Sequence, residues 1–243
     1  MIVFDAHAHG DREECALRQK QGVLTMLSSG TPEQAEKAFA LAEEFPVLCV
    51  TSGLHPWYSN QYDVEAMLPY VKKVPVIGEI GLDCVWCEVP MEIQKKVFIR
   101  QLDWVREMGK PVVLHTKGCE SAIADILDDY PELTCIVHWY SGPVDVLPRY
   151  LSRKNCYFTI GPDAAVSESV QAVIQAVPQD RILFETDGMG AVRWAIGEVK
   201  TECLSDVLQK DVVFAAKMRG VSPEALAQAA NENFLRLSRM QSR

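Results

Sequence analysis

The sequence predicts one α/β domain folded as a (β/α)8 barrel of the TIM type. Eight short apolar runs alternate with longer segments of helical pattern along the 243 residues. That length is close to the roughly 250 residues that such a barrel typically takes. No shift in composition and no linker rich in Pro, Ser or Gly divides the sequence. We therefore treat residues 1–243 as a single domain.

The eight runs have the length and composition of buried parallel strands. Several lack polar alternation, as expected when helices cover both faces of a sheet. A doubly wound open sheet would use the same elements and is the structural alternative. The expected strands span residues 2–7, 22–29, 46–54, 74–79, 111–116, 134–138, 156–160 and 181–186.

Capping residues mark where several of the intervening helices begin and end. The run TPEQ at residues 31–34 supplies an N-cap, a proline at the first helical position and a glutamine three residues after the cap. Apolar residues at helical spacing continue from Ile93 to Met108, where Gly109 stops the helix. The run SPE at residues 222–224 opens a final helix toward Leu237. Pro148 predicts a late start or a kink in another helix.

The composition argues against several classes of protein. With a formal net charge of −9 and a pI of about 5.1, the chain does not hold nucleic acid by bulk positive charge. The first ten residues lack the basic start and apolar core of a signal peptide, and no run resembles a membrane span. Eight cysteines without regular pairing are typical of reduced thiols. We expect a cytoplasmic protein with no membrane contact and no obligate protein partner.

The first expected strand closes on DAHAH at residues 5–9. Side chains alternate between the faces of a strand, so His7 and His9 project to the same side and can chelate one metal ion. Asp5 shares that face one layer deeper, where it would support the metal site from outside the ligand set. A surface pair of histidines without a metal is the alternative interpretation.

All five histidines fall at or just past the carboxyl end of an expected strand, and acids end two further strands. In a (β/α)8 barrel that end carries the active site. Polar residues also collect at strand ends without any function, but the long helices here contain no histidine. The histidines are His7, His9, His55, His115 and His138, and the acids are Glu79 and Asp187.

This set supplies enough ligands for two divalent ions, with Glu79 placed to bridge them. Two such ions roughly 3.5–4 Å apart can activate a water molecule and stabilise a leaving oxygen. We assign Asp187 as the general base that takes the proton of that water. Glu185 has the same strand parity as Asp187 and should point into the barrel one layer lower, where it would support a ligand or pack with bound water.

Seven segments along the chain carry a resemblance to a known family. They are FDAHAHG at 4–10, GLHPW at 53–57, VIGEIGLDC at 76–84, PVVLHTKG at 111–118, IVHWYSG at 136–142, ILFETDGMG at 182–190 and NENFLRL at 231–237. In this order and spacing, the sequence resembles the TatD-type metal-dependent deoxyribonucleases and hydrolases, which are amidohydrolase-like barrel enzymes. The GEIGLD and ETD segments are the most specific, and the resemblance spans nearly the whole chain.

The resemblance implies a barrel, a two-metal site and a role for each ligand. His55 would contact substrate or bound water, and Asp83 would support its loop. Imidazole ligands suit Zn²⁺, Mn²⁺ or Ni²⁺, whereas the family's nucleases are usually described as magnesium-dependent, so we expect two divalent ions chosen from Mg²⁺, Zn²⁺ and Mn²⁺. His7, His9, Glu79 and Asp187 would bind one ion, and Glu79, His115 and His138 the other.

Departures from the family pattern bear on the substrate. Lys117 stands where the family usually has arginine, which keeps a positive charge for phosphate but loses the bidentate fork. The stretch from Gly190 to Lys200 has little of the usual pattern, and we interpret it as an altered loop. Four tryptophans near the active face offer surfaces for stacking on a base, with packing as the alternative. They are Trp57, Trp86, Trp139 and Trp194, and Arg12, Arg149 and Arg193 are further candidates for phosphate contacts.

We therefore predict a divalent-metal-dependent hydrolase that cleaves phosphodiester bonds in DNA through a metal-activated water, with Lys117 offsetting the added negative charge. Hydrolysis of an amide, a lactone or a small phosphoester by the same metals is the alternative, which the altered loop and the acidic pI favour somewhat. A metal-binding protein without catalysis is a third interpretation, opposed by the complete ligand set.

Overall fold

The computed structural model describes residues 1–239 and has the predicted barrel. Its eight parallel strands follow one another in chain order. That order confirms the (β/α)8 prediction and excludes a doubly wound sheet, in which the strand order reverses at a switch point. β8 returns to β1, where Asp187 N donates to His7 O at 3.0 Å. The strands are β1 Asp5–Ala8, β2 Thr25–Ser29, β3 Leu48–Ser52, β4 Val76–Gly81, β5 Val112–His115, β6 Cys135–Val137, β7 Cys156–Ile160 and β8 Ile182–Phe184.

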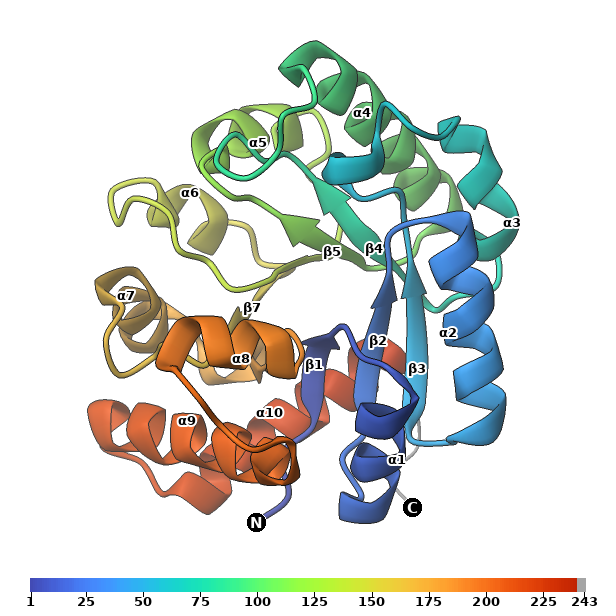
Figure 1. Ribbon diagram of the computed structural model, residues 1–243. Coiled ribbons are helices and arrows are strands. Elements are labelled where there is room, and N and C mark those ends of the chain that lie inside the picture. The colour runs from blue at the N-terminus through green and yellow to red at the C-terminus, as the bar shows by residue number, and fades with distance from the viewer. Residues whose placement is uncertain (240–243) are drawn as a thin grey trace.

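Helices cover the outside of the strands (Figure 1). They are α1 Arg12–Gln21, α2 Pro32–Glu44, α3 Leu68–Val71, α4 Met91–Met108, α5 Glu120–Leu127, α6 Leu147–Leu151, α7 Glu168–Ala176, α8 Met189–Ile196, α9 Leu204–Arg219 and α10 Pro223–Ser238. Short 3₁₀ turns are η1 Pro56–Tyr58, η2 Val64–Met67, η3 Gln179–Arg181 and η4 Thr201–Cys203. None of the helices in residues 1–239 is both long and apolar enough to cross a membrane.

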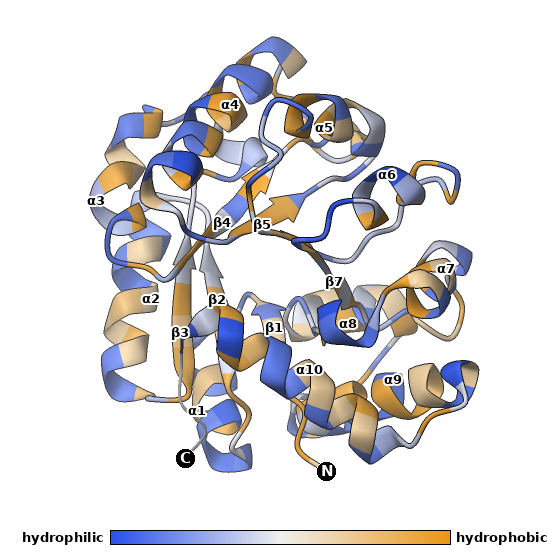
Figure 2. Ribbon diagram, turned by 180° about the vertical axis from the view of Figure 1, so that it is seen from behind, coloured by the Kyte–Doolittle hydropathy of each residue, from blue (hydrophilic) through white to orange (hydrophobic). Residues whose placement is uncertain are grey.

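The strands are buried on both faces. Every strand residue except Tyr157 is buried, which explains why the strand sequences lack polar alternation. Figure 2 shows β3 and β5 in hydrophobic colours, whereas helices such as α2 and α4 carry both kinds of residue. The helices therefore pack an apolar side onto the barrel and turn a polar side to solvent.

The predicted caps are present, with one difference in detail. Thr31 Oγ1 accepts from Gln34 N at 3.2 Å and so caps α2. The Gln34 side chain accepts from the N–H of Gly30, at 2.8 Å, one residue before the cap. α4 ends at Met108, where Gly109 takes the left-handed conformation. Pro148 is the second residue of α6, so the predicted late start of that helix is confirmed.

The prediction of a loop from Gly190 to Lys200 is wrong for most of that stretch, because α8 occupies Met189–Ile196. Met189 and Val192 are fully buried three residues apart, which is helical spacing. Glycine at the second helical position obscures this pattern, since glycine disfavours a helix interior.

Candidate metal centre

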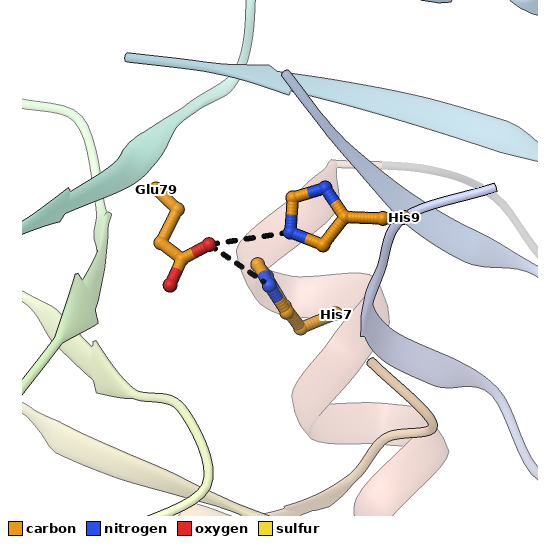
Figure 3. Close-up of side chains that lie close together, drawn as sticks. All are labelled: His7, His9 and Glu79. Atoms are coloured by element: carbon orange, nitrogen blue, oxygen red, sulfur yellow. Dashed lines mark hydrogen bonds and ion pairs between the residues drawn. The ribbon is translucent and has the colours of Figure 1, made fainter. Parts of the chain in front are cut away.

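The predicted ligands come together at the carboxyl ends of the strands. They lie in or directly beneath a cavity of about 710 Å³. Within it, Glu79 from β4 faces two histidines from the end of β1 (Figure 3). His7 and His9 come from β1 and the residue after it, His115 ends β5, His138 follows β6, and Asp187 follows β8. The placement predicted for all five histidines is confirmed, since His55 lies three residues beyond β3.

Glycines in β4 allow Glu79 to approach its partners. Gly81 has a φ of 155°, and a Cβ at that position would collide with the carbonyl oxygen of His115. Gly78 would meet Val113 in the same way. The GEIG sequence therefore lets β4 lie unusually close to β5 and brings the Glu79 carboxylate against the His115 ring.

One oxygen of Glu79 faces the histidines of β1. Glu79 Oε2 lies 3.3 Å from His7 Nε2 and 3.3 Å from His9 Nε2 (Figure 3). Asp187 Oδ1 lies 3.5 Å from His7 Nε2 and 3.7 Å from His9 Nε2. Ligands bound tetrahedrally at 2.0–2.1 Å from an ion stand about 3.4 Å from one another. These four side chains therefore already have the mutual spacing of a ligand set.

The other oxygen of Glu79 faces a second pair of histidines. Glu79 Oε1 lies 2.6 Å from His115 Nδ1 and 2.9 Å from His138 Nε2. Each oxygen of Glu79 thus faces its own pair of imidazole nitrogens, while the His7 and His138 rings also lie close together, with centroids 4.4 Å apart. This is the arrangement in which a carboxylate can bridge two cations.

Two carboxylates outside the proposed ligand set contact its histidines from the far side. His115 Nε2 lies 2.9 Å from Asp83 Oδ2, and His138 Nδ1 lies 3.3 Å from Glu185 Oε1. Both nitrogens of each ring therefore lie beside a carboxylate, and these carboxylates raise the pKa of His115 and His138 against the effect of burial. With a cation on the Glu79 side, the outer carboxylate would accept the remaining N–H and orient the ring, which is typical of metal-binding histidines. Glu185 lies where the strand parity predicts.

His7 provides the test of whether these residues suit a cation. Its side chain is fully buried, and neither ring nitrogen has a hydrogen-bond partner among residues 1–239. A buried imidazole without a partner is costly. Its Nε2 points between the carboxylates of Glu79 and Asp187. A divalent cation would satisfy all three groups, so the donor set fits a metal.

The electrostatics of the centre also favour a cation. Burial and nearby His138 act to lower the pKa of His7, yet Glu79 and Asp187 raise it to about 9. Burial acts to raise the pKa of Glu79, but the surrounding imidazoles hold it well below its usual range. The pKa of Asp187 is lowered in the same way. The cluster therefore presents ionised carboxylates in a buried place, where they attract positive charge.

His55 differs from the other histidines of the cluster. Its distances to Glu79 and His115 would also suit a shared ion. However, His55 Nδ1 accepts from Trp57 N at 3.2 Å, so the hydrogen of the neutral ring is on Nε2. Burial lowers the pKa of His55 to about 4 and keeps it neutral. His55 thus presents an N–H donor to the cavity, 3.5 Å from Glu79 Oε1, which suits the expected contact to substrate or water.

Of the four candidate phosphate contacts, Lys117 alone lines the cavity among the described residues. Its Nζ donates to Ser141 Oγ at 3.1 Å. The arginines are engaged elsewhere: Arg12 with Glu44, Arg149 with Asp125 and Asp128, and Arg193 with Val199 O and Thr201 Oγ1.

Asp5 lies beneath the candidate centre, beside a buried partner that the sequence analysis did not predict. Its carboxylate accepts from Thr186 N and Thr186 Oγ1 and contacts no predicted ligand side chain. Arg18 Nη1 donates to Asp5 Oδ2 at 2.7 Å, and both side chains are fully buried. Asp83, in turn, accepts from the backbone N–H groups of Val85 and Trp86 and so holds the loop after β4.

The fold and this donor set define a (β/α)8 barrel with a candidate histidine–carboxylate metal centre at the carboxyl ends of its strands, where such barrels carry their active sites. More specifically, the chain belongs to the TatD related DNase family, whose sequence pattern matches residues 4–239. The family predicted from the sequence segments is therefore confirmed.

Individual relatives agree with this assignment. The chain is 28% identical over 207 residues to the uncharacterized metal-dependent hydrolase YabD of Bacillus subtilis, covering 76% of this chain and 80% of that protein. It is 30% identical over 189 residues to the 3'-5' ssDNA/RNA exonuclease TatD of Dickeya dadantii, covering 73% and 72%. The crystal structure of YJJV, a TatD homologue from Escherichia coli, superposes with a TM-score of 0.83 at 23% identity over 98% of both chains, which supports the fold.

Proposed function

We propose that this protein is a divalent-metal-dependent hydrolase that cleaves phosphodiester bonds in DNA. The observation that carries the proposal is the position of Glu79, whose two oxygens face separate pairs of imidazole nitrogens at the open end of the barrel. Membership in the TatD related DNase family and the similarity to an exonuclease support DNA as the substrate.

Two divalent cations, chosen from Mg²⁺, Mn²⁺ and Zn²⁺, suit this donor set. When bound, such cations lower the pKa of a water molecule and offset the charge on phosphoryl oxygens. Zn²⁺ and Mn²⁺ suit the imidazoles, and Mg²⁺ suits the carboxylates. His7, His9, Glu79 and Asp187 would hold one cation, and Glu79, His115 and His138 the other.

Asp187 is the residue that accepts the proton of the attacking water. Neighbouring imidazoles lower the pKa of Asp187 against the effect of burial, so it is ionised at neutral pH. Its backbone has a φ of 55°, a conformation that residues other than glycine rarely adopt. The hydrogen bond from Asp187 N to His7 O holds that conformation beside the ligands of β1. The carboxylate is thus fixed beside His7 and His9, where it would be able to take a proton from a water in the site.

Lys117 and His55 act on the phosphate. The ammonium group of Lys117 offsets the negative charge that grows when water adds to phosphorus. The Nε2–H of His55 donates to a phosphate oxygen or to the water. A cavity of about 710 Å³ takes one small ligand. The similarity to a 3'-5' ssDNA/RNA exonuclease supports entry of the reacting nucleotide from a strand end rather than from within a duplex.

Degradation of end-labelled single-stranded DNA tests this function. Purified protein with Mg²⁺ or Mn²⁺ should shorten the strand, and EDTA should stop the reaction. Asp187→Asn should abolish shortening without changing the circular dichroism spectrum. Asp129→Asn, an exposed carboxylate outside the cavity, is the matched control and should retain activity. No shortening by protein that demonstrably binds metal would contradict DNA as the substrate.

A further inference from the structure

Two exposed tryptophans face each other at the cavity. Trp86, in the loop after β4, is 49% exposed, and Trp194, in α8, is 66% exposed. Their ring centroids lie 5.4 Å apart at an interplanar angle of 82°. Neither indole N–H donates to a protein group within residues 1–239. Both residues line the cavity. Two large rings kept in water beside a binding site are typical of a surface that a ligand covers.

The other two tryptophans of the cavity are held by hydrogen bonds. Trp57 Nε1 donates to Asp83 Oδ2, and Trp139 Nε1 donates to Asp163 Oδ1, both at 2.7 Å. The Trp139 ring lies 6.1 Å from the Trp194 ring. Trp86, Trp194 and Trp139 therefore form one aromatic wall of the cavity. Hydrogen bonds therefore hold the Trp57 and Trp139 rings in place, whereas the indole N–H groups of Trp86 and Trp194 make no such bond within residues 1–239.

Positive charge at this wall is limited to one side chain. Lys117 Nζ lies 4.5 Å from the centre of the Trp86 ring, within the range of a cation–π contact. It is the one lysine or arginine that lines the cavity in the described part of the chain. The chain as a whole carries a net charge of −9. With so few cationic side chains at the cavity, contacts to the bases are the larger source of affinity that the protein side chains at this wall can offer a single strand.

We propose that Trp86 and Trp194 form the subsite for the terminal base of a single-stranded DNA substrate, with Lys117 at the adjoining phosphate. This inference rests on the proposed function. A base at a strand end exposes a π-face that an indole can cover, whereas paired bases inside a duplex cover one another. The wall therefore selects single-stranded ends and tolerates any base, because every base has such a face.

Binding without metal separates this subsite from the hydrolytic reaction. The probe is a fluorescent single-stranded octanucleotide in EDTA, compared with strands whose terminal residue at either end is abasic. The protein should bind the intact strand about tenfold more tightly than one of the abasic strands, as expected for one stacked base. Since a single phosphate contact is involved, the logarithm of affinity should fall with the logarithm of salt at a slope of about −0.7.

Variants test whether the Trp86 and Trp194 rings cause the preference for the intact strand. Trp194→Ala and Trp86→Ala should each bring the ratio between intact and abasic strands close to one. Trp194→Phe should keep part of it, because phenylalanine still stacks. Val213→Ala, at an exposed apolar residue of α9 outside the cavity, is the matched control and should keep the full ratio.

Failure of the base subsite and failure of the nuclease function would give different results. Base-dependent binding without hydrolysis under Mg²⁺ or Mn²⁺ would keep the subsite and overturn the nuclease. Hydrolysis that removes abasic and intact ends with equal kcat/KM would keep the nuclease and overturn the subsite. An undiminished ratio in the alanine variants would also overturn it.

Discussion

Asp5 and Thr186 join the first and last strands of the barrel through one buried carboxylate. Asp5 Oδ1 accepts from Thr186 N at 2.9 Å, and Asp5 Oδ2 accepts from Thr186 Oγ1 at 2.6 Å. Arg18 completes the network from α1. His7 follows Asp5 by two residues and Asp187 follows Thr186 by one. The network therefore sets the position of His7 relative to Asp187, the two candidate metal ligands that follow it.

Arg18→Met should destabilise the protein strongly. Removing the guanidinium leaves the Asp5 carboxylate buried without its counter-charge, which typically costs about 3–5 kcal/mol. Urea unfolding measures the loss. The Asp5→Asn/Arg18→Met double variant should recover part of the loss, because it removes both charges. Arg100→Met breaks an exposed ion pair with Glu65 and should cost less than about 1 kcal/mol. Equal losses for Arg18→Met and Arg100→Met would contradict this account.

Glu185→Gln should weaken metal binding without unfolding the barrel. Glu185 accepts from His138 Nδ1, and its negative charge makes the opposite nitrogen a better ligand. Loss of such a partner typically lowers metal affinity about 10- to 100-fold. Competition with a chelator of known affinity measures the change. Glu88→Gln, at an exposed position outside the cavity, serves as the control. Unchanged affinity in Glu185→Gln would contradict a role for the Glu185 charge in metal binding by His138.

His55→Ala and His115→Ala should differ in metal content. Because Trp57 N donates to His55 Nδ1, His55 offers a hydrogen rather than a lone pair to the cavity. His55→Ala should therefore retain both equivalents of metal and lose turnover. His115→Ala should lose one equivalent. Elemental analysis after dialysis gives the stoichiometry, and loss of metal from His55→Ala would instead make His55 a ligand.

The strand positions and the gathering of the candidate ligands at one face could be predicted from the sequence. A strand covered on both faces is mostly apolar, so runs such as residues 46–54 are visible without a structure. The ends of parallel strands meet at one face, which places Glu79 near His115 although they are 36 residues apart.

Arg18 and the state of His55 could not be predicted in this way. In sequence, Arg18 looks like any charged residue on a helix surface. Its burial depends on how α1 packs against Thr186, which lies 168 positions away in the chain. The tautomer of His55 depends on the backbone of η1, which brings the N–H of Trp57 to the ring. Such properties arise from tertiary contacts that periodicity does not encode.

Asp211→Asn should remove part of the pH dependence of stability. Asp211 Oδ2 is buried in α9 without a hydrogen-bond partner among residues 1–239. Burial, reinforced by the charge of Asp163, raises the pKa of Asp211 to about 8. In the unfolded chain an aspartate ionises near pH 3.9. The contribution of Asp211 is therefore fully present below about pH 4 and is lost as the pH rises to about 8.

The variant should consequently gain stability relative to the native protein between pH 5 and pH 8, at up to about 1.4 kcal/mol per pH unit. Free energies of unfolding in urea at pH 5, 6, 7 and 8 measure this difference. Asp206→Asn, at an exposed position in the first turn of the same helix, should follow the native pH profile. Parallel profiles for Asp211→Asn and the native protein would mean that Asp211 is ionised in the fold. Its buried Oδ2 would then need a hydrogen-bond donor as a partner in place of a proton.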